Sequence, residues 1–413
     1  MSITDKRYKI RGKEFLWGDN YWNENGKNWF ISCKLNIIFF IDEKTSVITP
    51  VAKIPFRSGI CFRLHPRCIK YGEKIFCIPD MGEDIYSYNL NQNSWNKIVI
   101  SNTNNTRVAM YDFWICDNLL YVVSNGLNKV FVLDLEKEIL LGDYNIITDD
   151  SKDRIVHSIK LGNFIYSLSS NNPKIYKFDC EQKTVNSYLL PDIEDRFYTI
   201  SFDGEKFWLS GYCKKLYIWN EISNTIKILN EFPVDFGSYD FSGKKNEVFD
   251  CKSEIYSSPT FIFSTNINNY MWFIPFRTNK ILYIEKDKFL LHEYYLDDEI
   301  RTEKDIKEGL LDHMYLLEYV KEDRYLGLLS LKTGNIIEID GSNLQNKKIE
   351  YTFNENCDEI IIQNIFDENH NFYENEQLVL PDLLKFNKKS NVDNEGGLSF
   401  KVGKSIYMAL NNV

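Results

Sequence analysis

The sequence lacks the two features that would carry a chain to or across a membrane. It has no run of about eighteen consecutive apolar residues, the length that a transmembrane helix requires. Its first seven residues include Asp5, Lys6 and Arg7 and no apolar stretch, so they do not resemble a secretory signal. We therefore expect a cytoplasmic protein with no membrane partner.

The chain also has fewer basic than acidic residues. The chain has 49 lysines and arginines against 59 aspartates and glutamates, which gives a formal net charge of −10. Proteins that bind nucleic acid without sequence preference need a basic face that displaces counterions from phosphates. An anionic membrane surface makes the same demand. We therefore expect no nucleic-acid partner.

The cysteines give no sign of a disulfide framework or a metal site. There are nine, an odd number, and they are scattered, several of them within apolar strand patterns. The nearest approach to a zinc site is Cys61, His65 and Cys68, whose spacing matches no standard zinc-binding pattern. In an extended strand Cys61 and His65 would share one face and Cys68 would point to the other. We expect reduced thiols in the core, no metal and no cofactor.

Catalytic signatures are missing as well. None of the five histidines is accompanied by a Gly-x-Ser-x-Gly elbow or a recognisable Cys/His pair. Gly403-Lys404-Ser405 resembles the end of a phosphate-binding loop, but Leu398 stands where that loop requires glycine. The sequence thus leaves enzymatic activity open and favours a protein that is not an enzyme.

What the sequence has is a repeated strand. Seven times a short aromatic-rich or branched strand ends in a single acid or amide, and successive repeats lie 47, 45, 45, 41, 65 and 55 residues apart. A period near 45 is typical of a four-stranded propeller blade. An acid or amide at this place caps the next turn by accepting a backbone N–H two residues on. The closing residues are Asp42, Asn89, Asp134, Asp179, Asn220, Glu285 and Asp340.

Each unit reads as strand, turn, strand, loop, strand, turn, strand. Because one blade cannot bury both its faces, the set must close into a ring. We predict an all-β propeller in residues 1–353 with seven four-stranded blades, six being the alternative count, and a partly helical tail in 354–413 that packs on or closes it. We expect loop insertions at 233–254 and 298–312, the second with a short helix. The predicted blades are 9–54, 58–98, 106–144, 152–190, 194–232, 255–297 and 312–353.

The repeat resembles the kelch family over about residues 20–353. Lys74–Ile78, Asp84–Asn89 and Asn93–Ile98 together look like a kelch unit with its tyrosine and tryptophan in order. The resemblance implies a propeller; kelch-like propellers include protein-binding scaffolds and enzymes such as galactose oxidase and sialic acid mutarotase, so it implies no activity. This chain departs from the family because the glycine doublet after the second strand is replaced, and no functional residue carries over. The replacements are Pro79-Asp80, Ser124-Asn125, Ser169-Ser170 and Ser210-Gly211.

Four arginines recur where the chain enters the innermost strand of a blade, at one mouth of the expected channel. They are spaced 44, 47 and 42 residues apart, and His65 and His157 lie beside two of them. If the positions are equivalent, the guanidinium groups face one mouth and can bind a carboxylate or phosphate. Alternatively, each arginine pairs with a neighbouring acid, Asp153 or Asp195, and joins blades together. The arginines are Arg63, Arg107, Arg154 and Arg196.

A second cluster precedes the first predicted hairpin. Trp17, Tyr21 and Trp22 lie among amides that include Asn23 and Asn25. Aromatic plates flanked by amides suit a sugar ring or a partner's loop. Packing between the first and last blades is the alternative, and we favour it.

These patterns lead to two functional hypotheses. The first is a monomeric, non-catalytic binding or scaffold module that holds a protein partner at one channel mouth and its rim loops. The alternative is an enzyme or receptor for a small anionic carbohydrate or carboxylate, held by the four arginines, with His65 or His157 as acid–base group.

Overall fold

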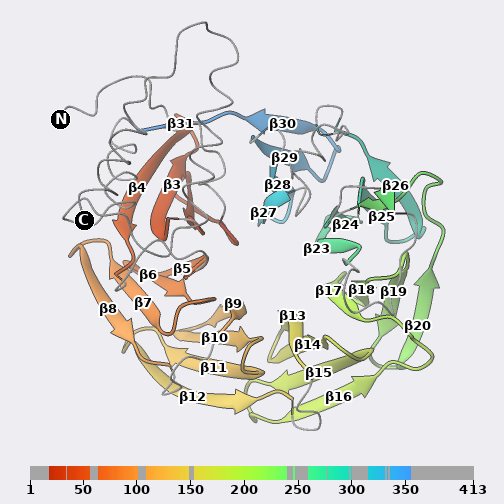
Figure 1. The fold of residues 1–413 in the computed structure, drawn as a ribbon, viewed down its shortest axis with the longest axis horizontal. Helices are drawn as coiled ribbons and strands as arrows, with labels where there is room; N and C mark the ends of the chain where they lie inside the picture. The colour runs from red at the N-terminus through yellow and green to blue at the C-terminus, as the bar shows by residue number, and fades with distance from the viewer. Residues whose placement is uncertain are drawn as a thin grey trace, which may run out of the picture.

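The computed structural model describes residues 18–33, 35–55, 64–100, 108–147, 153–239, 245–246, 259–276, 278–296, 299, 315–330, 333 and 335–354. Within these ranges seven antiparallel sheets stand in a ring around a central axis (Figure 1). The prediction of an all-β propeller with seven four-stranded blades is confirmed. Among the described residues, no helix is long and apolar enough to cross a membrane.

In every blade the strands follow chain order from the axis outwards (Figure 1). Blades 1 to 3 contain β1 (Trp22–Glu24), β2 (Lys27–Ile31), β3 (Ile37–Asp42) and β4 (Val47–Lys53); β5 (Arg67–Tyr71), β6 (Lys74–Ile78), β7 (Ile85–Asn89) and β8 (Ser94–Ile98); and β9 (Met110–Cys116), β10 (Leu119–Ser124), β11 (Lys129–Asp134) and β12 (Ile139–Asn145). Blades 4 and 5 contain β13 (Ile155–Leu161), β14 (Phe164–Ser169), β15 (Lys174–Asp179) and β16 (Val185–Leu189); and β17 (Phe197–Phe202), β18 (Phe207–Gly211), β19 (Leu216–Asn220) and β20 (Thr225–Leu229). Blades 6 and 7 contain β23 (Phe261–Ile267), β24 (Tyr270–Pro275), β25 (Ile281–Glu285) and β26 (Leu290–Tyr294); and β27 (Tyr315–Lys321), β28 (Tyr325–Ser330), β29 (Ile336–Asp340) and β30 (Asn346–Ile349).

All seven closing residues end the third strand of a blade, as the repeat predicts. The Asp42 carboxylate accepts the backbone N–H groups of Lys44 (3.0 Å) and Thr45 (2.9 Å), so it caps the turn into β4. The side chain of Glu285 is one methylene longer than that of an aspartate, and its carboxylate instead lies 2.6 Å from the Lys288 ammonium. Turns are capped in the same way by Asn89, Asp134, Asp179, Asn220 and Asp340.

Burial depends on a strand's place in its blade. The second strands, such as β10 and β14, are almost fully buried because neighbouring blades cover both their faces. The outer strand β12 alternates between exposed and half-buried residues. Aromatic rings fill the space between blades 4 and 5: Phe207 lies 4.7 Å from Tyr166 and 4.9 Å from Trp219, measured between ring centroids. The six described cysteines are free, and five of them are buried.

The ring is closed at its outer edge by a short additional strand, here called the latch. After blade 7, β31 (Thr352–Phe353) returns to blade 1 and pairs in parallel with β4 as a fifth strand (Figure 1). The Thr352 N–H donates to the Ser46 carbonyl (2.9 Å), and the Asn354 N–H donates to the Ile48 carbonyl (2.9 Å). The last described residues therefore hold the first blade against the seventh.

Several predicted segments are only partly described. The predicted start of the first blade at residue 9 lies outside the described residues, and β1 begins at Trp22. The predicted tail lies outside them after Asn354, as does all of the 298–312 insertion except Glu299. In the 233–254 insertion, β21 (Ser238–Tyr239) and β22 (Lys245–Asn246) form a short hairpin.

Candidate functional site

The register of the inner strands shows which arginines are equivalent. Ile155 pairs with Ser169 in blade 4, and Phe197 pairs with Gly211 in blade 5, so Arg154 and Arg196 precede their inner strands at the same position. In blade 3 the pair Met110–Ser124 gives that position to Ala109 rather than to Arg107. Arg63 and Arg107 lie outside the described residues. Of the four predicted arginines, Arg154 and Arg196 therefore stand at equivalent positions before their inner strands.

The acid before each of these arginines points into its own blade. The buried Asp153 carboxylate accepts the Ser169 hydroxyl (2.6 Å), the Tyr176 hydroxyl (3.1 Å) and the Arg154 backbone N–H (2.8 Å). It thereby fastens the start of β13 to β14 and β15. The Arg154 side chain donates from Nη1 to the Asp153 backbone carbonyl (2.8 Å) and is exposed.

Asp195 repeats this arrangement in blade 5. Its carboxylate accepts the backbone N–H groups of Tyr212 (3.0 Å) and Cys213 (3.2 Å) and the Tyr217 hydroxyl (3.1 Å). Burial raises the pKa of Asp195 above its ordinary value, and these hydrogen bonds oppose part of that effect. In both Asp-Arg dipeptides the acid therefore has a structural role, because its carboxylate joins the start of the inner strand to neighbouring strands of the same blade.

A β-bulge follows the arginine position in each of these inner strands. The ladder shifts by one residue at Tyr111 in β9, at Val156-His157 in β13 and at Tyr198 in β17. A bulge leaves its residue out of the ladder and turns its side chain in a new direction, and for this reason bulges are common at binding sites. The bulges supply side chains from three blades to one place.

These side chains line a pocket of about 510 Å³, here called the bulge pocket. It lies beside β9, β13 and β17, which border the centre of the ring (Figure 1). The Asn125 amide, from blade 3, donates to the Val156 carbonyl (2.6 Å) and so holds the bulge of the next blade. The lining residues are Ala109, Tyr111, Asn125, Gly126, Arg154, Ile155, Val156, His157 and Tyr198.

Aromatic and charged neighbours fix the orientation of the lining rings. The His157 ring meets the Tyr198 ring edge-on at 5.0 Å, and His157 Nδ1 lies 3.9 Å from the Asp112 carboxylate. The Arg196 guanidinium is 4.3 Å from the centre of the Tyr212 ring, which in turn meets Tyr198 edge-on at 6.3 Å. Arg196 therefore supports the wall of the bulge pocket through two tyrosines and does not line it.

The opposite wall is held in a similar way. The Arg67 guanidinium lies 4.5 Å from the centre of the Tyr111 ring and pairs with the Asp19 carboxylate at 3.0 Å. The Tyr111 hydroxyl donates to the buried Asp80 carboxylate at 3.5 Å. Both tyrosines that line the pocket are thus packed against an arginine or an arginine-bound ring.

His65, predicted as an additional donor, lies elsewhere. It is 2% exposed, its Nε2 is 2.8 Å from the Asp84 backbone carbonyl, and its ring meets Tyr86 edge-on at 5.3 Å. Burial lowers the pKa of His65 to about 4, so the ring is neutral near pH 7. His65 packs the interior of blade 2 and is not among the residues that line the bulge pocket.

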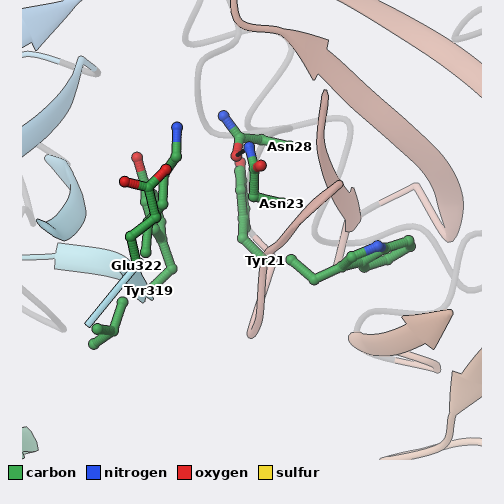
Figure 2. Close-up of a pocket in the computed structure, with 8 residues that line it drawn as sticks. Tyr21, Asn23, Asn28, Tyr319 and Glu322 are labelled. Atoms are coloured by element: carbon green, nitrogen blue, oxygen red, sulfur yellow. Dashed lines mark hydrogen bonds between the residues drawn. The ribbon is translucent and has the colours of Figure 1, made fainter. Parts of the chain in front are cut away.

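A second, smaller hollow of about 290 Å³ lies between blades 1 and 7 and is here called the seam hollow (Figure 2). The Tyr21 ring stacks on Phe30 of blade 1 at 4.6 Å and on Tyr319 of blade 7 at 6.0 Å. This is the packing between first and last blades that the sequence favoured for the aromatic cluster; Trp17 lies outside the described residues. The lining residues are Tyr21, Trp22, Asn23, Asn28, Tyr319, Val320, Lys321 and Glu322.

Sequence reasoning missed Tyr111, Asn125 and Tyr198. Two of them are bulge residues, and a bulge is visible only when both paired strands are known. Tyr198 follows Arg196 by two residues, and this closeness to a predicted site residue was the one feature of the sequence that could have indicated it. Asn125 belongs to the pair that replaces the kelch glycine doublet, a position noted only for its departure from the family.

Comparison with known proteins identifies the fold only. No family model and no curated protein matches the chain. The extracellular domain of a protein described as a one-component system in B. thetaiotaomicron is similar with a TM-score of 0.54 and 11% identity, over 79% of this chain and 41% of that one. PorZ, a surface component of the type-IX secretion system of Porphyromonas gingivalis, gives 0.50 and 10%, over 80% and 37%.

The chain therefore spans about two fifths of the length of these two solved structures. The computationally designed Ika8 protein has a TM-score of 0.46 and 9% identity, over 77% of this chain and 94% of that one. At identities this low, the similarities with TM-scores of 0.54 and 0.50 indicate a shared fold alone and carry no information about activity.

Proposed function

We propose that this propeller is a binding module whose bulge pocket holds a small ligand through an anionic group, most simply a carboxylate. The observation that supports this is the convergence of one exposed guanidinium, one imidazole and two tyrosine rings in a single pocket. Arg154, His157, Tyr111 and Tyr198 reach it from three successive blades.

The chemistry of the lining suits a carboxylate attached to a ring or an apolar body. A guanidinium binds a carboxylate through two parallel hydrogen bonds, and His157 offers one further donor beside it. The tyrosine rings offer faces and edges to the rest of the ligand. A volume of about 510 Å³ lies within the usual range for small-molecule pockets. Arg154 is the one permanently charged side chain among the nine lining residues, and a guanidinium in a concave site attracts anions.

Binding without catalysis is supported by what the pocket offers for proton transfer. Among the nine described residues that line it, His157 is the one histidine, and none is a serine, threonine, cysteine or acid. Nucleophilic catalysis needs a nucleophile beside its base. The enzyme alternative relies on the same Arg154 and His157, with His157 as acid–base group.

The test is titration of the full chain with sugar acids, dicarboxylates and inorganic phosphate, followed by calorimetry and thermal stabilisation. We expect saturable binding of at least one carboxylate and a loss of roughly tenfold to a hundredfold in affinity for Arg154→Ala, because a charge-assisted hydrogen-bond pair is lost. Arg154→Lys keeps the charge and loses the planar fork, so it should restore only part of the affinity.

Arg324→Ala is the matched control. Arg324 is also partly exposed and bonds the Asp340 carboxylate (3.0 Å from Nε) in blade 7, far along the chain from the bulge pocket. It should leave carboxylate binding unchanged. The proposal fails if no anion binds saturably, or if Arg324→Ala weakens binding as much as Arg154→Ala. Turnover of a bound sugar acid that His157→Gln abolishes would favour the enzyme alternative.

A further inference from the structure

The seam hollow differs from the bulge pocket in charge and chemistry, and the following inference is independent of the proposed function. We propose that the seam hollow is a second binding site, for a small neutral, hydroxyl-rich ligand such as one saccharide unit. The site would use the Tyr21 hydroxyl and the amides of Asn23 and Asn28 (Figure 2).

The first step rests on the Tyr21 hydroxyl. Tyr21 is 8% exposed, and its hydroxyl has no hydrogen-bond partner among the residues that the structure describes. A buried polar group left unpaired is costly, so native proteins nearly always supply a partner. Tyr21 lines the seam hollow, and a ligand hydroxyl there would be such a partner.

The second step is that the Tyr21 ring is held rigidly. It stacks almost parallel on Phe30, with 4° between the planes, and on Tyr319, with 13° between the planes. These contacts fix the ring in the wall of the hollow, where blade 1 meets blade 7. A rigid, positioned hydrogen-bonding group loses little entropy when a ligand binds.

The third step concerns the amides. The Asn23 amide Nδ2 donates to the Asn28 side-chain oxygen Oδ1 (2.8 Å), and the Asn28 amide Nδ2 in turn donates to the Glu43 carboxylate (3.4 Å). This chain sets the orientation of both amides. Amides and a tyrosine hydroxyl together offer donors and acceptors, and a sugar's hydroxyl groups need both.

The fourth step is charge. Across the hollow, the Lys321 ammonium lies 2.6 Å from Glu43, and the exposed Glu322 completes the wall. The lining therefore carries one basic and one acidic side chain, and the lysine is already paired, in contrast to the bulge pocket with the exposed Arg154. A lining with balanced charge suits a neutral ligand. The volume, about 290 Å³, lies at the lower limit of small-molecule pockets and suits a single ring.

The experiment is calorimetric titration of the full chain with D-glucose, D-galactose and N-acetyl-D-glucosamine, supported by thermal unfolding. Calorimetry is required because sugars at high concentration stabilise most proteins by being excluded from their surfaces. We expect saturable heat with at least one sugar, and binding that weakens roughly tenfold in Tyr21→Phe, which removes one hydroxyl and keeps the stacked ring.

Tyr21→Phe has a second, opposite signature. Without sugar it should melt at a higher temperature than the wild type, because it removes a buried unpaired hydroxyl. A tyrosine whose hydroxyl is hydrogen-bonded within the protein would give the reverse. Asn23→Ala provides an independent variant at the rim and should also weaken sugar binding, whereas Arg154→Ala should leave it unchanged.

Three results would overturn the inference: no sugar giving saturable heat, equal sugar affinity in Tyr21→Phe and the wild type, or a Tyr21→Phe variant less stable than the wild type without sugar. Carboxylate binding at the bulge pocket is measured separately, through Arg154. A failed test of the seam hollow therefore does not affect the proposed function, and a failed test of the bulge pocket does not affect the inference about the seam hollow.

Discussion

The seam between blades 4 and 5 and the seam between blades 7 and 1 use the same position in the repeat and fill it differently. Glu221 and Glu43 each follow a closing residue and reach back to the preceding blade. Glu221 accepts the hydroxyls of Tyr166 (2.7 Å) and Tyr188 (2.8 Å) and pairs with Lys177 at 2.6 Å. These partners all belong to blade 4, so one carboxylate joins three of its strands.

At the closing seam, Glu43 pairs with Lys321 of blade 7 at 2.6 Å, and a hollow lies beside the pair. The additional support there comes from the Tyr21–Tyr319 stack and the β31 latch. The comparison shows that blades 4 and 5 are joined by dense aromatic packing. The pair that closes the ring is joined by a few specific contacts, which leave a hollow of about 290 Å³ beside them.

The largest expected effect concerns the aromatic packing between blades 4 and 5, here called the internal seam. Trp219 is fully buried, and its ring lies 4.9 Å from Phe207 and 5.1 Å from Tyr188. Trp219→Ala should lower the free energy of unfolding by about 3–5 kcal/mol, because it opens a cavity between blades 4 and 5. Chemical denaturation measures this. Ile222→Ala, at a side chain that is 98% exposed, is the control and should change stability by less than about 0.5 kcal/mol.

The second effect compares the two glutamates directly. Glu221→Gln should cost about 1–3 kcal/mol, because it removes the acceptor charge from three hydrogen bonds and leaves Lys177 without its ion pair. Glu43→Gln should cost about 0.2–1 kcal/mol, as expected for a partly exposed pair. Equal losses in the two variants would show that the seams do not differ in the way their contacts indicate.

The pH dependence of stability sharpens the same comparison. Although burial acts to raise it, the hydrogen bonds from Lys177, Tyr166 and Tyr188 lower the pKa of Glu221 below its ordinary value of 4.5. A carboxyl group with a lowered pKa in the folded state stabilises the protein above its unfolded value, and this stabilisation is lost as pH falls through the folded value. The stability gap between the wild type and Glu221→Gln should therefore be full near neutral pH and shrink below pH 4.5. A gap that widens in acid would contradict this.

A smaller effect is expected at the latch. Thr352→Pro removes the N–H that donates to the Ser46 carbonyl and should cost about 0.5–1.5 kcal/mol. Thr352→Ala keeps the N–H and is the matched control. Hydrogen exchange at the Thr352 and Asn354 amides would report the opening of β31 in the wild type. If proline and alanine have the same effect, the pairing with β4 contributes nothing.

The smallest effect belongs to the ion pair across the closing seam. Lys321→Ala should cost about 0.2–1 kcal/mol, because the pair with Glu43 is partly exposed. A double-mutant cycle with Glu43→Gln isolates the pairwise contribution. A coupling energy above that range would mean that the closing seam depends on this pair as heavily as the internal seam depends on Glu221.

Much of the propeller could be predicted from local chemistry. Short-range hydrogen bonds fix the closing residues other than Glu285 at the strand ends, so Asp42 and its equivalents identified the last residue of each third strand. The equivalence of Arg154 and Arg196 was also visible, because the Asp-Arg pair repeats in sequence. The burial of Asp153 and Asp195 depends on hydroxyls of other strands and was not visible.

The parts that could not be predicted depend on contacts between distant segments. Each bulge results from a register that needs both strands, so Tyr111 and Tyr198 carried no local sign of their place. His65 has the residue type of a catalytic base, but its partners Asp84 and Tyr86 bury it. The parallel pairing of β31 joins residues about three hundred positions apart, and a two-residue strand leaves no periodic pattern.

The bulges have a consequence for how such a ring acquires new specificity. Since each bulge residue lies outside the hydrogen-bonded ladder, exchanging Tyr111, His157 or Tyr198 changes the lining of the bulge pocket while the strands that frame it keep their pairing. Under the proposed function, each of the three blades would contribute its own exchangeable side chain, and recognition could evolve, or be engineered, one blade at a time.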